Sequence, residues 1–239
     1  MTGATPRTRA DIAILGGGLA GGLIALALRR EDPALDVVLV EAGEALGGNH
    51  RWSWFESDLN FEGEALLSPF RKTHWPVGYA VLFPEHTRTL DSVYFSLSSA
   101  DFDAGLRREL AQSTIRTNRK VVAVDAKGAT LAGGERIEAR CVIDARGFIP
   151  SDAFEGGWQV FMGRHLRTTK PHQLDRPLVM DARVKQHGAF RFLYTLPLSA
   201  EELFVEDTYY QDTPELDRSI LSARLDRYCA AVGWEGEPM

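Results

Sequence analysis

Three glycines near the N-terminus have the spacing found in turns that bind phosphate groups. An apolar run, residues 12–15, is followed directly by Gly16, Gly18 and Gly21 in a G-x-G-x-x-G pattern. In such a turn the first glycine permits a tight bend, the second leaves room for a pyrophosphate, and the third lets a helix pack closely on a strand. The free amides at the positive end of that helix would bind the pyrophosphate. The pattern therefore predicts a dinucleotide site.

An acidic residue stands where such a site contacts a ribose. Glu41 ends a second apolar run, residues 37–40, and lies about 20 residues beyond the last glycine. A carboxylate at that position accepts hydrogen bonds from both free hydroxyls of an adenosine ribose, which favours FAD or NAD over NADP. The alternative is a glycine turn that only packs. The complete order of strand, turn, helix, strand and acid favours the dinucleotide site.

A parallel sheet must bring these residues together. The two apolar runs have the character of buried parallel strands, with a helix through Leu28 between them. A third apolar run, residues 141–144, is expected to be strongly buried and to join the same sheet. Asp144 and Gly147 mark its carboxyl end, where ligands of open α/β sheets lie. We expect them to close over the nucleotide; a simple strand terminus is the alternative.

A glycine-rich loop and a group of large rings follow Glu41. Gly48 belongs to the loop over residues 42–50, and a loop of this kind lets the backbone lie against a flat cofactor, unless it is a plain surface turn. Trp52 and Trp54 come next. Rings at this density form either ordinary core or the lining of an apolar pocket, and composition leaves both interpretations open.

Beyond residue 76 the pattern changes to short alternating runs, which predict antiparallel strands rather than the opening β-α-β order. Helices are predicted over residues 99–110 and, with amphipathic spacing, over residues 213–232. The last four strands are expected to form a mostly antiparallel sheet that covers the cofactor. The strands predicted in this part of the chain span residues 79–83, 89–90, 93–97, 117–124, 129–131, 136–139, 159–162, 178–184, 190–196 and 203–209.

Composition excludes several classes of protein. The 239 residues are 44% hydrophobic and 25% charged, which is typical of a globular protein with a substantial core. The net charge of -6 and the absence of a basic block exclude nucleic acid as an expected partner. Cys141 and Cys229 are isolated, so we expect no disulfide framework and no metal site, in a reducing cytoplasm. Residues 1–10 are predicted to be a disordered tail.

One uncharged stretch raises the question of a membrane span. Residues 12–28 carry no charge, as would a span or a signal segment. Three consecutive glycines at 16–18 would break a helix before it could cross, since a spanning helix needs about 20 apolar residues. We therefore expect no span here.

Several longer motifs make the chain resemble the bacterial lycopene β-cyclases. The resemblance covers nearly the whole chain, from Asp11 to Trp234. Its later motifs are more specific than the glycine pattern. The matching segments are residues 16–25 (GGGLAGGLIA), 41–43 (EAG), 47–50 (GGNH), 74–76 (HWP), 190–192 (FRF), Tyr194, 196–199 (LPLS) and 203–210 (LFVEDTYY).

The resemblance implies a Rossmann-type FAD-binding domain of the glutathione-reductase-like and p-hydroxybenzoate-hydroxylase-like kind, joined to an antiparallel β-sheet substrate domain. The FAD-binding domain is expected over residues 11–75 and 98–157. The substrate-covering domain is expected over residues 76–97 and 158–212, with residues 213–239 beginning a helical segment. Family members run further, with another flavin-contacting glycine segment and a helical C-terminal region. The resemblance therefore implies a C-terminally truncated chain whose independent activity is in question.

The implied activity is lycopene β-cyclase, in carotenoid biosynthesis. The resemblance implies that the linear ends of lycopene are cyclised to β-rings, giving γ-carotene and then β-carotene, without net redox change. It further implies that FAD must be in its reduced form, with NAD(P)H as the electron donor. The acid of the family's Glu-Asp-Thr motif falls on Glu206, with Asp207 beside it.

This chemistry suits the residues around Glu206. Cyclisation begins when an acid protonates a terminal alkene, so the acid must be neutral in a dry environment. Apolar neighbours can hold a carboxyl group protonated by desolvation, which makes Glu206 the expected general acid; an exposed acid on a sheet edge is the alternative. On a strand, Asp207 would point to the opposite face and fix another partner. Aromatic faces that could stabilise the cation are Trp52, Trp54, Phe192 and Tyr194.

A water-insoluble substrate must arrive from a bilayer, so we expect a cytoplasmic protein that contacts the inner membrane peripherally through an apolar patch. Two other functions stay open. One is an FAD-dependent monooxygenase or a polyprenyl or carotenoid reductase, because the opening module is common to that larger class. The other is an inactive flavin-binding fragment. The oligomeric state, the range of carotenoids accepted and the choice between NADH and NADPH are left open.

Overall fold

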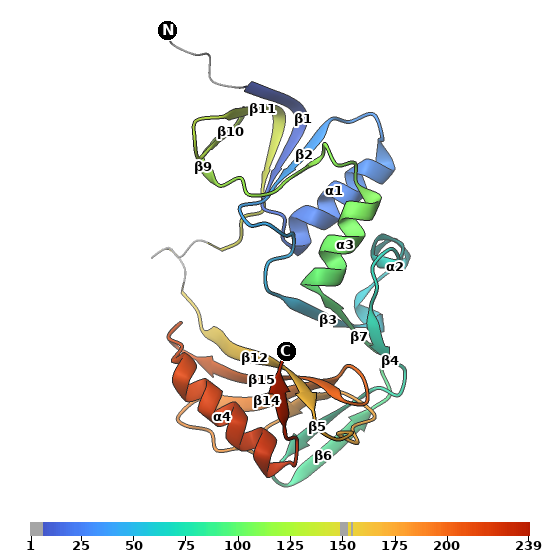
Figure 1. Ribbon diagram of the computed structural model, residues 1–239, viewed down its shortest axis with the longest axis vertical. Coiled ribbons are helices and arrows are strands. Elements are labelled where there is room, and N and C mark those ends of the chain that lie inside the picture. Colours follow the sequence, from blue (N-terminus) through green and yellow to red (C-terminus); the bar gives the residue numbers. More distant parts are fainter. Residues whose placement is uncertain (1–6, 149–152, 154) are drawn as a thin grey trace. The chain divides into compact units, whose positions relative to one another are not determined.

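The computed structural model describes residues 7–148, 153 and 155–239, which divide into two compact units (Figure 1). The first unit takes its residues from Met1–Trp54, Asp58–Lys72 and Ser96–Ile149. The second takes them from Phe55–Ser57, Thr73–Phe95 and Pro150–Met239. These units differ from the predicted domains at several places. Residues 55–57, 73–75, 153 and 155–157 fall in the second unit, residues 96–97 fall in the first, and residues 213–239 join the second unit rather than a following segment. Positions 149–152 and 154, near a predicted boundary, lie outside the described residues.

The first unit contains a six-stranded sheet with the order β8-β2-β1-β11-β10-β9. The central strand β1 pairs in parallel with β2 and with β11, as a nucleotide-binding sheet requires. Antiparallel strands β10 and β9 extend the sheet beyond β11. The bounds are β1 Arg7–Leu15, β2 Val37–Val40, β8 Ile115–Arg116, β9 Val121–Asp125, β10 Gly128–Leu131, β11 Arg136–Asp144, α1 Leu19–Glu31, α2 Phe61–Leu67 and α3 Ser99–Glu109.

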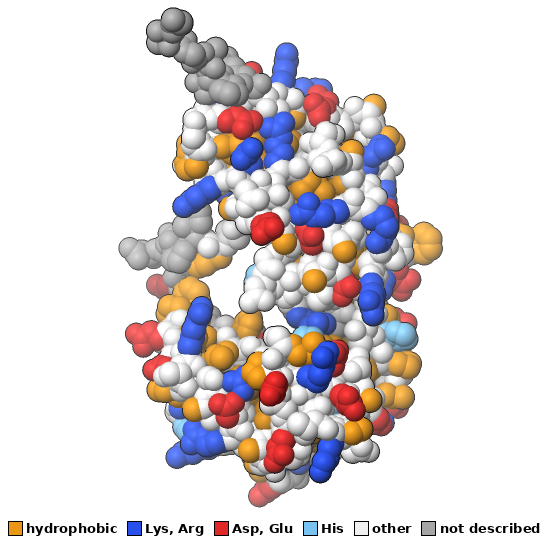
Figure 2. Space-filling view, in the orientation of Figure 1, with side chains coloured by type: hydrophobic (Ala, Val, Ile, Leu, Met, Phe, Trp, Pro, Cys, Tyr) orange, Lys and Arg blue, Asp and Glu red, His pale blue; other side chains and the backbone are white. Residues whose placement is uncertain are grey.

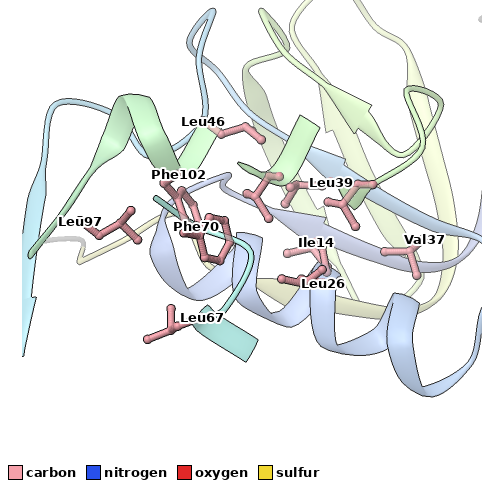
Figure 3. Close-up of a cluster of buried hydrophobic side chains, with 12 residues drawn as sticks. Ile14, Leu26, Val37, Leu39, Leu46, Leu67, Phe70, Leu97 and Phe102 are labelled. Atoms are coloured by element: carbon pink, nitrogen blue, oxygen red, sulfur yellow. The ribbon is translucent and has the colours of Figure 1, made fainter. Parts of the chain in front are cut away.

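The main core of this unit lies between its sheet and its helices. Ile14 of β1, Leu26 of α1 and Phe102 of α3 are fully or almost fully buried in one apolar cluster, drawn in Figure 3. The rings of Phe70 and Phe102 pack with their centroids 5.0 Å apart. This core fixes α1 against the strands that precede and follow it, and so positions the glycine turn between β1 and α1.

Three details of this sheet differ from the sequence-based expectations. Strand β1 begins at Arg7, inside the predicted tail, because it pairs with β11 along its whole length. The predicted strand 117–124 is replaced by β8 and β9. Residues 136–139 and 141–144 form one strand, β11, and its last residues are not strongly buried: Val142 and Ile143 pack against separate clusters and Cys141 is exposed.

The second unit is built on a seven-stranded sheet with the order β16-β12-β15-β14-β13-β5-β6. Its pairs are antiparallel except for β13 with β5, so the predicted mostly antiparallel sheet is confirmed. Strand β15 lies between β12 and β14 over nearly its full length. The bounds are β5 Tyr79–Phe83, β6 His86–Leu90, β12 Trp158–Thr168, β13 Leu178–Asp181, β14 Phe190–Pro197, β15 Glu202–Gln211 and β16 Gly236–Pro238.

Helix α4 (Arg218–Ala231) covers one face of this sheet. Leu225 and Cys229 of α4 pack in one buried cluster with Leu193, Leu203 and Val205 of β14 and β15. The helix is shorter than the predicted 213–232 because the Asp217 carboxylate accepts hydrogen bonds from the amides of Ser219 and Ile220 and so caps its first turn. Leu216, Ile220 and Val232 are exposed, although the amphipathic spacing of the predicted helix places all three on its apolar side.

Short elements complete the fold. A three-stranded sheet has the order β3-β7-β4, with β3 Arg51–Phe55, β4 Thr73–Trp75 and β7 Tyr94–Ser98. A 3-10 turn, η1, spans Glu56–Asp58. In the part of the chain that the structure describes, every helix is too short or too polar to cross a bilayer. Acidic and basic side chains are interspersed over the molecular face shown in Figure 2.

Candidate functional site

The glycine turn of the first unit has the geometry that a dinucleotide site needs. A Cβ atom on Gly21 would lie 2.0 Å from the Gly16 carbonyl oxygen, so only glycine allows α1 to begin this close to the turn. Gly16 has a φ of +105°, and a Cβ atom there would lie 2.4 Å from the carbonyl oxygen of Ala145, which follows β11. Nothing lies within 4 Å of the corresponding position on Gly18, which leaves room for a phosphate group.

The residues present fit the adenosine diphosphate half of FAD. Helix α1 has Gly18 at its N-cap, with no side-chain hydrogen bond and no acidic residue in the first turn, so its positive end is available to an anion. The Glu41 carboxylate is fixed by two amides, with 2.8 Å from Gly17 N to Oε2 and 2.7 Å from Gly43 N to Oε1. Each oxygen retains a lone pair for a ribose hydroxyl.

The other residues predicted for this site are Asp144, Gly147 and Gly48, and they differ in backbone conformation and in the partners they bind. Asp144 ends β11 beside Leu15 of β1, and its carboxylate is bound by Arg146, 2.6 Å from Nη2 to Oδ2. Gly147 has a φ of +92° and open space at its Cβ position. Gly48 has a φ of +62° in the loop after β2. The β1 and β11 ends are therefore adjacent, as expected, while the Asp144 carboxylate already has a cationic partner.

In the second unit, Glu206 lies in the middle of an aromatic face of the sheet. It stands directly opposite Gly163 of β12 and Tyr194 of β14, so these three residues share a face. Strand alternation places Phe204 and Thr208 on the same face. We use the name aromatic face for the rings at these positions, which are Phe161, Phe190, Phe192, Tyr194, Phe204 and Tyr210.

One glycine determines how closely a ring approaches the acid. A Cβ atom on Gly163 would lie 2.4 Å from Cζ of Phe204, so the ring crosses the space that a side chain at position 163 would fill. Because Gly163 is the direct neighbour of Glu206 across the strands, this ring lies beside the carboxyl group. The absence of a side chain at Gly163 is thus what lets Phe204 shield Glu206 from water.

The environment of Glu206 favours its neutral form. Burial raises the pKa of its carboxyl group to about 7, although a hydrogen bond from Thr208 opposes this shift. Thr208 Oγ1 donates to Glu206 Oε1 over 2.8 Å. Since Oε1 accepts that bond, the proton of the neutral acid resides on Oε2. Near neutral pH, Glu206 is therefore able both to give up and to recover a proton.

Asp207 points to the other face and has a different environment. It is fully buried, and its carboxylate forms a bidentate ion pair with Arg191, at 2.6 Å to Nε and 2.9 Å to Nη2. The Tyr209 hydroxyl donates a third bond, of 3.1 Å, to Oδ2. As strand alternation predicted, the two acids share no face, and Asp207 is bound to a cation.

The four rings predicted for a substrate pocket separate into two groups. Phe192 and Tyr194 belong to the aromatic face, and the Tyr194 hydroxyl lies 3.0 Å from that of Tyr94. Trp52 and Trp54 pack against the core of the first unit, where the ring of Trp52 meets Phe102 edge to face at 5.2 Å. Both tryptophans are half-buried, so they pack against this core and keep part of their surface exposed.

Sequence reasoning included Phe204 among the apolar neighbours of the acid but missed Gly163 and Thr208. The signal for Phe204 and Thr208 was present, because residues two positions either side of Glu206 on a strand share its face. No local signal identified Gly163, since its position depends on the pairing of β12 with β15.

Comparison with known proteins identifies the family. The family model described as lycopene cyclase protein matches residues 11–238. A lycopene beta-cyclase from Pseudescherichia vulneris is 43% identical over 94% of this chain and 58% of its own length. A lycopene beta-cyclase from Paracoccus is 41% identical over 95% of this chain, again with 58% of that protein covered. The chain thus spans 58% of the length of these curated relatives.

Solved structures with the same fold include flavin enzymes. A geranylgeranyl bacteriochlorophyll reductase-like protein from Thermoplasma acidophilum has a TM-score of 0.70 at 16% identity, covering 98% of this chain and 65% of that one. A flavin-dependent halogenase from Xanthomonas campestris has a TM-score of 0.64 at 15% identity, covering 98% and 60%. The predicted fold class, a Rossmann-type domain with an antiparallel sheet, is confirmed by this likeness.

Proposed function

Because this chain belongs to the lycopene cyclase family, we propose that it carries the acid that cyclises the linear ends of lycopene to β-rings, giving γ-carotene and then β-carotene. The observation that supports this function is the position of Glu206, a carboxyl group with a pKa of about 7 in the middle of an aromatic face. Cyclisation of a hydrocarbon substrate needs both features, since the substrate offers no polar group to bind and ring closure begins with the addition of a proton.

The reaction places definite demands on these side chains. Glu206 transfers the proton on Oε2 to the terminal double bond, and ring closure carries the positive charge into the new ring. Neighbouring aromatic faces such as Phe192 and Tyr194 stabilise that charge by about 0.5–2 kcal/mol each. The Glu206 carboxylate then takes a proton back from the ring, which completes an isomerisation, so atoms and electrons balance without an oxidant or reductant. Glu206 Oε1 accepts the hydrogen bond from Thr208 throughout, so Oε2 is the oxygen that carries the transferred proton.

We propose FAD as the cofactor, held by the Gly16–Gly21 turn, the N-terminus of α1 and Glu41. The open space at Gly18 and the fixed Glu41 carboxylate support this assignment. When bound and reduced by NAD(P)H, the flavin would supply negative charge that favours a cationic intermediate. Gly48, Asp144 and Gly147 remain candidates for further contacts with it.

We propose that the protein works at the cytoplasmic surface of the inner membrane, from which the carotenoid enters. Phe161, Phe190 and Tyr210 of the aromatic face are 47%, 40% and 46% exposed, and such rings suit contact with a lipid interface. Flotation with carotenoid-loaded vesicles tests this. Protein that stays in the dense fraction at every lipid composition would contradict it.

Expression in cells that accumulate lycopene, followed by pigment analysis, tests the function. The chain is expressed alone and together with the part of the Pseudescherichia vulneris relative that it does not cover. We expect β-ring carotenoids in at least the second case. Glu206→Gln should abolish them, and Glu215→Gln, a change of an exposed acid, should not. Ring formation that survives Glu206→Gln would contradict the role of Glu206.

A monooxygenase is the second candidate, favoured by the likeness to a putative FAD containing monooxygenase from Photorhabdus luminescens, with a TM-score of 0.57 at 17% identity. Stoichiometry separates the two functions. A cyclase yields a product of the same mass as lycopene, whereas a monooxygenase adds oxygen and consumes NAD(P)H for each turnover. Mass spectrometry of the pigment therefore decides between them.

A further inference from the structure

A strongly basic pocket lies on the α4 side of the second unit's sheet, the side opposite the aromatic face. It has a volume of about 550 Å³ and is bordered by α4, the end of β13, the start of β14 and the segment between these strands. A single acid, Asp181, lines it. The lining residues with basic side chains are Arg183, Lys185, His187, Arg191, Arg224 and Arg227.

Two of these cations are already neutralised. Arg191 pairs with buried Asp207 and Arg183 pairs with Asp181, with closest distances of 2.6 and 2.9 Å. These pairs form part of the pocket wall and fix its shape.

Three other cations have no such compensation. Within the described parts of the chain, Lys185, Arg224 and Arg227 form no ion pair with an acid. Arg224 donates to the Tyr209 hydroxyl over 2.8 Å, and Arg227 donates to a backbone carbonyl of its own helix. Arg224 also interacts at longer range with the Asp217 carboxylate, whose pKa it lowers. Three cations without a direct acidic partner around one pocket repel one another unless an anion binds between them.

His187 lies within the same positive potential. Although the His187 side chain is exposed, loss of some hydration lowers the pKa of its imidazole, and the charges of Arg224, Arg191, Lys185 and Arg227 lower the pKa further. All four cations therefore act at one point of the pocket. An anion bound there would favour the imidazolium and reverse the shift.

We propose that this pocket binds a phosphate-bearing anion, either the headgroup of an acidic phospholipid or a free phosphate compound. Arg224 and Arg227 are three positions apart on α4, so both side chains reach the same side of the helix. Guanidinium groups match the oxygens of phosphate with paired hydrogen bonds, and Lys185 adds a flexible point charge from the facing segment. The proposal does not depend on Glu206 or on cyclisation.

The pKa of His187 provides the test. The full 239-residue chain is labelled at histidine, the His187 NMR signal is identified by its loss in His187→Gln, and its pKa is measured with three probes. The probes are inorganic pyrophosphate, vesicles of phosphatidylglycerol, and vesicles of phosphatidylcholine as the control for an uncharged headgroup. We expect the His187 pKa to rise with pyrophosphate, with phosphatidylglycerol, or with both, and the responding probe identifies the source of the phosphate.

Matched variants test whether the pocket is responsible. Lys185→Gln combined with Arg227→Gln should weaken the response by roughly tenfold or more, because two charge-assisted contacts are lost. Arg218→Gln removes an exposed arginine of the same helix outside the pocket and should leave the response unchanged. The proposal fails if neither acidic probe shifts the His187 pKa, if phosphatidylcholine shifts it equally, or if the double variant responds like the unaltered chain.

Discussion

Glu206 and Asp207 are consecutive acids on one strand, yet the protein gives them opposite environments. Glu206 lies on the aromatic face, beside the Phe204 ring, and burial raises its pKa to about 7. Asp207 lies on the α4 side, fully buried and bound by Arg191. Burial without a nearby cation favours the protonated form of a carboxyl group, whereas burial beside a cation favours the charged carboxylate. The same side-chain chemistry thus serves reaction on one face and structure on the other.

Removal of the Arg191 guanidinium group is expected to have the largest effect on the difference between the Glu206 and Asp207 environments. Arg191→Met leaves Asp207 buried and charged without its partner, which we expect to cost roughly 3–5 kcal/mol of unfolding free energy. Urea unfolding followed by circular dichroism measures it. Arg167→Met is the matched control, because the side chains of Arg167 and its partner Glu202 are 60% and 30% exposed and their ion pair is therefore worth less. Equal losses from the two variants would contradict the distinction.

The pH dependence of stability sharpens the contrast from the side of Glu206. Its folded pKa of about 7 lies above the ordinary value of 4.5, so its contribution is complete below pH 4.5 and is lost as the pH rises through 7. The full change corresponds to roughly 3 kcal/mol as an upper limit. We expect the unfolding free energy of the unaltered chain to fall relative to that of Glu206→Gln across this range. A constant difference between the two would show that Glu206 titrates normally.

Adding a side chain opposite Glu206 should bring the pKa of Glu206 closer to that of an ordinary carboxyl group. Gly163→Ala pushes the Phe204 ring away, admits water and lowers the pKa of Glu206 toward its ordinary value, with a packing cost of about 1–3 kcal/mol. Infrared spectroscopy of the protonated carboxyl band measures the pKa. Gly156→Ala, at a position with nothing within 4 Å, should change neither quantity. Phe204→Leu removes the shield without a clash and should lower the pKa as well.

The smallest expected effect comes from the hydroxyl group next to the acid. Thr208→Val removes the bond to Oε1, so the pKa of Glu206 should rise further, by an amount equivalent to about 0.5–1.5 kcal/mol. The same infrared titration detects it. Thr208→Ser keeps the hydroxyl and should retain the original pKa. A fall in the pKa of Thr208→Val would mean that the hydroxyl does not act on the carboxylate.

The sequence was sufficient for the features that depend on local order. The glycine spacing and Glu41 predicted the turn between β1 and α1, and the alternation of a strand predicted that Glu206 and Asp207 would diverge. The features it could not predict depend on partners distant in the chain. Asp207 pairs with Arg191 because of the register between β14 and β15. The Phe204 ring lies over Gly163 because of the register between β12 and β15. Trp52 and Trp54 are a similar case, because an aromatic residue in the sequence does not reveal which surface its ring will pack against.

The enclosure of β15 between β12 and β14 has a consequence for folding errors. A slip of one residue would carry Asp207 among the rings and turn Glu206 toward Arg191. It would also invert the apolar residues that α4 covers, so the misaligned sheet would lose its core together with its acid. The register of β15 that proton transfer needs is therefore maintained by the same hydrophobic packing that stabilises the unit.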